Sequence, residues 1–161
     1  MSPPAVLISG VVATAAMAAV FGVGRAVGAT RLSLPRLLGT GLTPDPAAGR
    51  RVGAAMLVGY GLALAPLFAM MLSGSRHTSV EGGAVLGLAF GLLVLVVAPA
   101  VLPLLHPRMA SPARGALSGR GLVPPGWLAL HYGGGTAPIT LLAHGAYGAV
   151  LGALLAPWVV R

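Results

Sequence analysis

One histidine and three hydroxyl-bearing residues are the best candidates for chemistry in this sequence. His144 lies seven residues into the last apolar run, with Thr140 one helical turn before it and Tyr147 three residues after it. Spacings of three and four residues place these side chains on one face of a helix. Tyr60 lies at a similar depth in an earlier apolar run. We predict a hydrogen bond from His144 to Tyr60, or to a backbone carbonyl freed by Pro66.

This polar cluster could serve three roles. A neutral His144 with satisfied hydrogen bonds would fix helix packing, which is the role we expect. Alternatively, His144 could line a ligand path or relay a proton, or it could ligate haem or a metal. Haem or metal ligation would need a second strong ligand at the same depth. No carboxylate lies inside an apolar run, which argues against ion-coupled transport.

Other motifs give weaker signals. His77 and Glu81 are four residues apart and could meet on a helical turn, but a zinc site needs three or four protein ligands. The run from Gly133 to Thr136 lacks the lysine and the preceding strand of a phosphate loop. The chain has one Asp, one Glu and no Cys, so no acid-based triad or thiolate site can be assembled. We therefore expect no catalytic residue, no metal site and no cofactor.

The elements that must position these residues are four apolar runs without charges. Hydrophobic residues make up 57% of the chain and charged residues 7%, against about 25% charged in a typical soluble domain. The runs cover about residues 4–24, 52–72, 83–105 and 137–158, and about 20 helical residues cross a bilayer. The sequence predicts an all-α integral membrane bundle of four transmembrane helices, with residues 1–161 as a single membrane domain. Asp45 followed by Pro46 predicts an N-cap and a first helical residue ahead of the second run.

The arginines predict an orientation in the bacterial plasma (inner) membrane. Eight arginines, Arg25, Arg31, Arg36, Arg50, Arg51, Arg108, Arg114 and Arg120, flank or occupy the first and third connections; only Arg76 and Arg161 lie on the other side. By the positive-inside rule, loops 25–51 and 106–136 are cytoplasmic and both termini are extracytoplasmic. Residues 121–135 could lie at the interface or form a re-entrant loop. The first run could instead be a cleaved signal peptide, although its basic residues follow the run rather than precede it.

Small residues recur at four-residue spacing in the runs. The third run has Gly83, Gly87 and Gly91, and the fourth has Gly148 and Gly152. Small side chains let helices approach closely in lipid, where apolar burial does not drive them together. The glycine stripes would serve internal packing or, alternatively, a seam with a second copy or a partner subunit.

Three segments resemble a family of small bacterial integral membrane proteins of unknown function. They are residues 34–39 (LPRLLG), residues 106–109 (HPRM) and the last run, in which His144 is followed by Tyr147, Gly148, Val150, Leu151 and Gly152. The resemblance implies a four-helix membrane fold and no particular activity. Members of that family often carry a histidine near the start of the second span, where residues 52–60 of this chain have none.

The sequence as a whole favours a non-enzymatic structural or accessory subunit of a membrane assembly. A small transporter or channel for a neutral or weakly polar solute is the first alternative. A haem- or metal-binding membrane protein that uses His144 is the second. The expected partners are the lipid bilayer and a homo-oligomer or larger complex. We expect no nucleic-acid binding, because the arginines flank apolar runs and form no basic helix.

Overall fold

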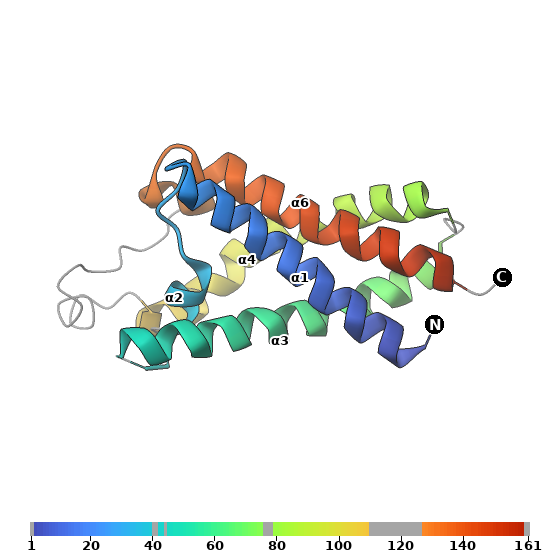
Figure 1. The fold of residues 1–161 in the computed structure, drawn as a ribbon, viewed down its shortest axis with the longest axis horizontal. Coiled ribbons are helices and arrows are strands. Elements are labelled where there is room, and N and C mark those ends of the chain that lie inside the picture. The colour runs from blue at the N-terminus through green and yellow to red at the C-terminus, as the bar shows by residue number, and fades with distance from the viewer. Residues whose placement is uncertain (1, 40–41, 44, 76–78, 110–126, 160–161) are drawn as a thin grey trace. The chain divides into compact units, whose positions relative to one another are not determined.

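The computed structural model describes residues 2–39, 42–43, 45–75, 79–109 and 127–159, and these residues form helices and connections without a strand. Figure 1 shows the order of the elements. The α-helices are α1 (Pro3–Ala26), α2 (Leu34–Gly39), α3 (Pro46–Ser73), α4 (Val80–Met109) and α6 (Thr136–Leu155), with 3-10 segments η1 (Trp127–Tyr132) and η2 (Ala156–Trp158).

Four of the described helices are long and apolar enough to cross a membrane. The candidate spans are Pro3–Ala26, Ala47–Ser73, Val80–Val97 and Thr136–Trp158. Large apolar side chains lie on the outside of these helices; Met70 is 74% exposed and Val85 68% exposed. Such surfaces are unfavourable in water and suit lipid contact. The prediction of an all-helical chain with four helices long and apolar enough to span a membrane is therefore confirmed for the described residues, and these helices suggest a membrane protein.

The helices extend beyond the apolar runs from which they were predicted. The second predicted span begins at residue 52, whereas α3 begins at Pro46, as the N-cap motif predicted. Asp45 accepts hydrogen bonds from the backbone N–H groups of Ala47 (3.2 Å) and Ala48 (2.8 Å), so the N-cap prediction is confirmed. Arg50 and Arg51 lie just before the apolar run of residues 52–72, but they are part of the same helix, which begins at Pro46. Helix α2 also lies within the stretch 25–51 that was predicted only as a loop.

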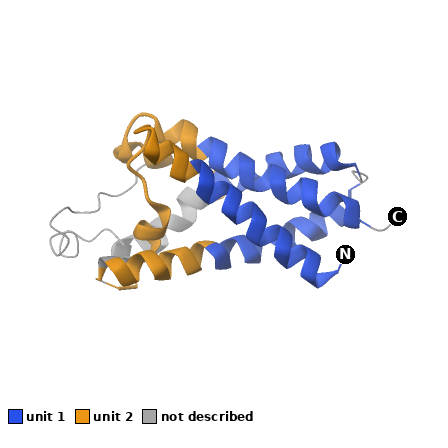
Figure 2. Ribbon diagram, viewed as in Figure 1, with its two compact units in different colours: residues 1–20, 58–95, 141–161 blue, residues 21–57, 96–140 orange. Residues whose placement is uncertain are grey.

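Two compact units make up the chain, coloured in Figure 2. Unit 1 comprises residues 1–20, 58–95 and 141–161, and unit 2 comprises residues 21–57 and 96–140. The long helices α1, α3, α4 and α6 each contribute residues to both units. We describe each unit by itself.

Unit 1 packs segments of all four long helices. Helix α1 meets α3 where a Cβ added at Gly10 would lie 3.0 Å from the Ala65 Cβ. Helix α3 meets α4 through Phe68 and Phe90, whose ring centroids are 5.2 Å apart at an interplanar angle of 51°. This tilted geometry is a favourable aromatic contact. The interior of unit 1 therefore combines small residues at these contacts with large buried side chains such as Phe68, Met17 and Leu72.

Unit 2 packs the short helix α2 against the beginning of α3. A Cβ added at Gly39 would overlap the carbonyl of Gly49, and one added at Gly53 would overlap the carbonyl of Pro35. The backbones of the two helices are therefore in direct contact, and a side chain at Gly39 or Gly53 would separate them. Leu37 on α2 is buried as a result.

Elsewhere in unit 2, the chain after α1 is tied to the segment that leads into α6. The hydroxyl groups of Thr30 and Thr136 are hydrogen-bonded at 2.7 Å, and both residues are buried. The backbone N–H of Arg31 donates to the carbonyl of Tyr132 at 3.0 Å. These bonds fix residues 30–32 beside η1. Segment η1 lies within the stretch 121–135 that was predicted to be interfacial or re-entrant; residues 121–126 of that stretch lie outside the described residues.

Candidate functional site

Three residues of the predicted polar cluster lie on α6, which is the most enclosed of the four described spans, and the fourth, Tyr60, lies on α3. The span Thr136–Trp158 is 56% buried, against 22% for Val80–Val97. His144 and Tyr147 belong to unit 1 and are 8% and 2% exposed. Thr140 belongs to unit 2, where its hydroxyl donates to the carbonyl of Thr136 at 2.8 Å. These α6 candidates therefore face protein and not lipid.

Tyr147 makes a polar contact that connects α6 to α3 in unit 1. Its hydroxyl donates to the carbonyl of Gly61 at 2.8 Å. A carbonyl oxygen has two lone pairs, so it can accept this bond in addition to a bond within its own helix. A buried phenol in an apolar bundle needs such an acceptor, because an unpaired polar group is costly there.

Glycine at position 61 makes room for this contact. A Cβ added at Gly61 would overlap the Thr14 hydroxyl and would lie 3.4 Å from the Tyr147 ring. The Thr14 hydroxyl donates to the carbonyl of Gly10 at 2.8 Å, within α1. Three helices thus meet at one glycine, with one hydroxyl group contributed by α1 and another by α6.

Thr14 was not among the residues predicted from the sequence. Ser9 and Thr14 are the polar side chains in the middle of the first apolar run, and both are buried. That pattern was a signal, because polar residues at membrane depth usually face the interior of a bundle. The candidates predicted from the sequence were His144, Thr140, Tyr147 and Tyr60, so the hydroxyl on α1 was missed.

The predicted pair of His144 and Tyr60 stays a prediction. His144 is buried, whereas the Tyr60 side chain is 41% exposed. The tyrosine whose hydroxyl bonds across to α3 is Tyr147, and its acceptor is Gly61, the residue after Tyr60. The alternative acceptor freed by Pro66 would be the carbonyl of Leu62, four residues before the proline. Gly61, the acceptor in the structure, is the residue before Leu62.

The glycine stripes of α4 and α6 lie against each other within unit 1. A Cβ added at Gly87 would overlap the carbonyl of Gly148, and one added at Gly148 would overlap the carbonyl of Gly87. Along the same stripe, a Cβ added at Gly83 would overlap the carbonyl of Gly152, and one added at Gly91 would overlap the carbonyl of His144. The helices are therefore antiparallel and in backbone contact at every fourth residue, close enough for Cα–H donors to meet carbonyl oxygens.

The geometry of this site suits packing better than reaction chemistry. The Thr14 and Tyr147 hydroxyl groups donate to backbone carbonyls, which cannot act as the base that a nucleophile requires. Within the described residues, no group of three or more His, Cys, Asp or Glu side chains could hold a metal ion. His77 of the predicted His77–Glu81 pair lies outside the described residues.

Two titratable groups outside the spans are perturbed. The backbone N–H groups of Ala48 and Ala47 lower the pKa of the Asp45 carboxyl below its usual 3.8, and nearby Arg51 lowers it further. Burial raises the pKa of the Tyr132 hydroxyl above its usual 10.0, while Arg36 opposes the shift. Asp45 is therefore ionised and Tyr132 neutral at physiological pH.

Comparison with known proteins finds no matching family model, no matching curated protein and no matching solved structure. The resemblance to small four-helix membrane proteins therefore rests on the residues named above and stays an interpretation of the sequence.

Proposed function

We propose that this chain is a non-enzymatic structural or accessory subunit of an assembly in the bacterial plasma membrane, which it crosses four times. The bond from Tyr147 to Gly61 is the main support for this role. It uses a buried hydroxyl on α6 to join two helices. The glycine contact between α4 and α6 has the same effect, because it fixes one helix against the other. A structural subunit of this kind needs a closely packed interior.

The proposed orientation places loops 25–51 and 106–136 in the cytoplasm and both termini outside. The arginine distribution supports it, with eight arginines at these loops and two on the opposite side. The glycine stripe of α4 is occupied by α6 of the same chain, so a partner would contact other faces. Exposed apolar residues on α3, such as Leu67 and Met70, are available for that purpose.

Purification from native membranes tests the proposed role. The chain is extracted in a mild detergent with an affinity tag, and the product is analysed by mass spectrometry and visible spectroscopy. We expect a stoichiometric partner chain and no Soret band. A Soret band that disappears in His144→Ala would contradict the proposal in favour of haem binding. A monodisperse chain without a partner that moves a neutral solute into vesicles would contradict it in favour of transport.

A further inference from the structure

The arginines of unit 2 form a strongly charged group that the packing role does not use. Residues 25–51 carry Arg25, Arg31, Arg36, Arg50 and Arg51, which we call the arginine cluster. Asp45 is the one acidic residue in the sequence of unit 2, and within residues 25–51 five arginines against one aspartate leave a formal charge of +4. Unit 2 therefore cannot neutralise these arginines with its own carboxylates.

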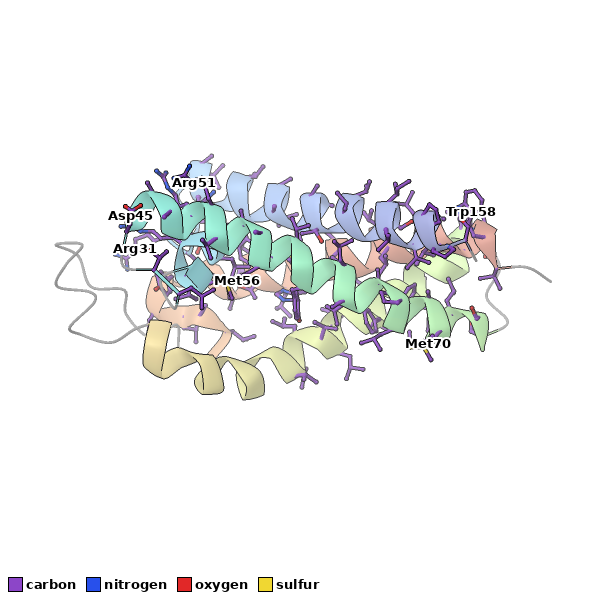
Figure 3. All side chains as sticks on the ribbon, turned by 90° about the horizontal axis from the view of Figure 1, so that it is seen from below. Arg31, Asp45, Arg51, Met56, Met70 and Trp158 are labelled. Atoms are coloured by element: carbon purple, nitrogen blue, oxygen red, sulfur yellow. The ribbon has the colours of Figure 1, made fainter. Side chains whose placement is uncertain are left out.

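The charged groups of the arginine cluster are accessible. Arg25, Arg31, Arg50 and Arg51 are exposed, and Arg36 is half-buried. Figure 3 shows Arg31, Asp45 and Arg51 at the end of unit 2 where α3 begins. Asp45 is already engaged, because its two carboxylate oxygens accept bonds from Ala47 and Ala48. Its carboxylate also occupies the N-terminus of α3, so any further anion must be bound by the arginines.

The backbone contacts of unit 2 hold the cluster in place. Helix α2 carries Arg36 and is in direct backbone contact with the first turns of α3, which carry Arg50 and Arg51. Arg31 is fixed through its backbone bond to the carbonyl of Tyr132. The Tyr132 side chain is half-buried and lies near enough to Arg36 for the two to interact electrostatically. A cationic group held by a rigid backbone loses little entropy on binding an anion.

The position of the cluster along the chain indicates which anion it meets. Arg25 lies in the last turn of α1, and Arg50 and Arg51 lie in the first turns of the second candidate span. Arginine and tyrosine at the ends of spans lie at the level of the lipid headgroups, where arginine can bind phosphate with two parallel hydrogen bonds. We propose that the arginine cluster binds the phosphodiester of an anionic phospholipid such as phosphatidylglycerol. This proposal requires the chain to span a membrane but does not depend on its being a subunit.

Lipid selectivity in nanodiscs tests the proposal. The full chain is placed in nanodiscs of phosphatidylcholine, and binding of fluorescent phosphatidylglycerol is measured by energy transfer from a dye on the protein. Each arginine near a charged membrane surface is worth about a fivefold change in affinity. Arg50→Gln with Arg51→Gln should weaken binding about 25-fold, and Arg50→Lys with Arg51→Lys should weaken it much less.

The matched control removes two charges from outside residues 21–57, through Arg76→Gln with Arg161→Gln. Circular dichroism in phosphatidylcholine alone verifies that every variant keeps its helical content. Retained binding in this control supports a localised site. An equal loss in the control, equal binding of phosphatidylcholine and phosphatidylglycerol, or full displacement by millimolar inorganic phosphate would overturn the proposal. Failure to find a partner chain bears only on the subunit role.

Discussion

At the scale of single residues, the Tyr147 hydroxyl illustrates how an apolar interior constrains polar groups. Tyr147 is 2% exposed, so it has no access to water and must find its acceptor within the protein. It finds one in the Gly61 carbonyl, which is reachable because position 61 has no side chain. Hydrogen bonds inside membranes are worth less than this argument suggests, about 0.6 kcal/mol on average, because the separated helices also find partners.

The change Tyr147→Phe should therefore lower the free energy of unfolding by about 0.6 kcal/mol, and by no more than roughly 1.7 kcal/mol. The ring and its packing stay, while the bond to Gly61 is lost. Reversible unfolding in mixed micelles with increasing denaturing detergent measures the difference. Tyr60→Phe is the matched control and should leave stability unchanged, because Tyr60 is 41% exposed and is not buried as Tyr147 is. An equal loss in both variants would instead favour the predicted bond between Tyr60 and His144.

Replacing Gly61 tests the space around the same contact. Gly61→Ala should cost about 1–3 kcal/mol, the usual cost of overpacking, because the added Cβ would overlap the Thr14 hydroxyl. Thr14→Ala in the same chain should recover part of that loss, since it removes the overlapping oxygen. A double-mutant cycle on the free energy of unfolding measures this coupling. Strictly additive losses would mean that Thr14 does not contact Gly61.

The Asp45 carboxylate should make the stability of α3 depend on pH. Backbone N–H donors lower its pKa in the folded state below 3.8, so its stabilising contribution is present above the unfolded pKa and is lost as pH falls through the lower folded pKa. Thermal unfolding measured from about pH 5 down to about pH 3 should show a falling midpoint. Asp45→Asn keeps an acceptor without the charge and should flatten this dependence. A fall of the same size in that variant would assign the effect to another group.

Much of this site could be predicted from residue types, and the rest could not for identifiable reasons. The spacing of His144 and Tyr147 predicted a shared face of one helix, and both side chains are buried on α6 in the structure. The acceptor for the Tyr147 hydroxyl was harder to identify, because a backbone carbonyl can accept such a bond wherever a glycine leaves space beside it. Sequence does not mark that space, since Gly61 and Gly59 look alike until the neighbouring helices are known. Gly61 faces Thr14, whereas Gly59 has nothing within 4 Å of an added Cβ.

At the scale of elements, the contact between α4 and α6 determines how those two helices pack. The stripe of Gly83, Gly87 and Gly91 was apparent from four-residue spacing, and either a second helix of the chain or another subunit could have filled it. The structure fills it with α6 of the same chain. Helix α2 could not be foreseen in the same way, because six residues are too short for a periodic pattern. Its position depends on backbone contacts at Gly39 and Gly53.

Alanine substitutions should distinguish a glycine in contact with a neighbouring helix from a glycine with open space beside it. Gly87→Ala would place a Cβ on the carbonyl of Gly148 and should lower the free energy of unfolding by about 1–3 kcal/mol. Gly59→Ala makes the same chemical change on α3 in open space and should be neutral or slightly stabilising, because alanine favours helix more than glycine. Unfolding in mixed micelles compares the two. Equal effects would show that α4 and α6 are not in backbone contact.

At the scale of the whole molecule, the proposed orientation in the membrane rests on charge and not on packing. The apolar helices would pack equally well either way up, so only the arginine count predicts which loops face the cytoplasm. Helix lengths could likewise be predicted only to within several residues, since α3 and α4 continue past charged or proline-containing sequence at their ends.

Cysteine labelling gives a direct measurement of that orientation, because the chain has no cysteine of its own. Ser79→Cys and Ala47→Cys each introduce one thiol at an exposed position near the end of a span. In intact cells, a membrane-impermeant maleimide should label the thiol at position 79 and should reach that at position 47 only after permeabilisation. The reverse pattern would invert the proposed topology, and labelling of both would contradict an odd number of crossings between them.

The backbone contact between α4 and α6 also limits how this protein can move. Because carbonyl groups of each helix sit in the gaps left by glycines of the other, the pair can slide only in whole steps of four residues, about 6 Å. One such step would carry Leu95 into the place of Gly91 in one direction, or His144 into the place of Gly148 in the other. A piston-like displacement of one helix along the other is thus blocked in both directions. Any conformational response must carry the α4–α6 pair of unit 1 as a single body.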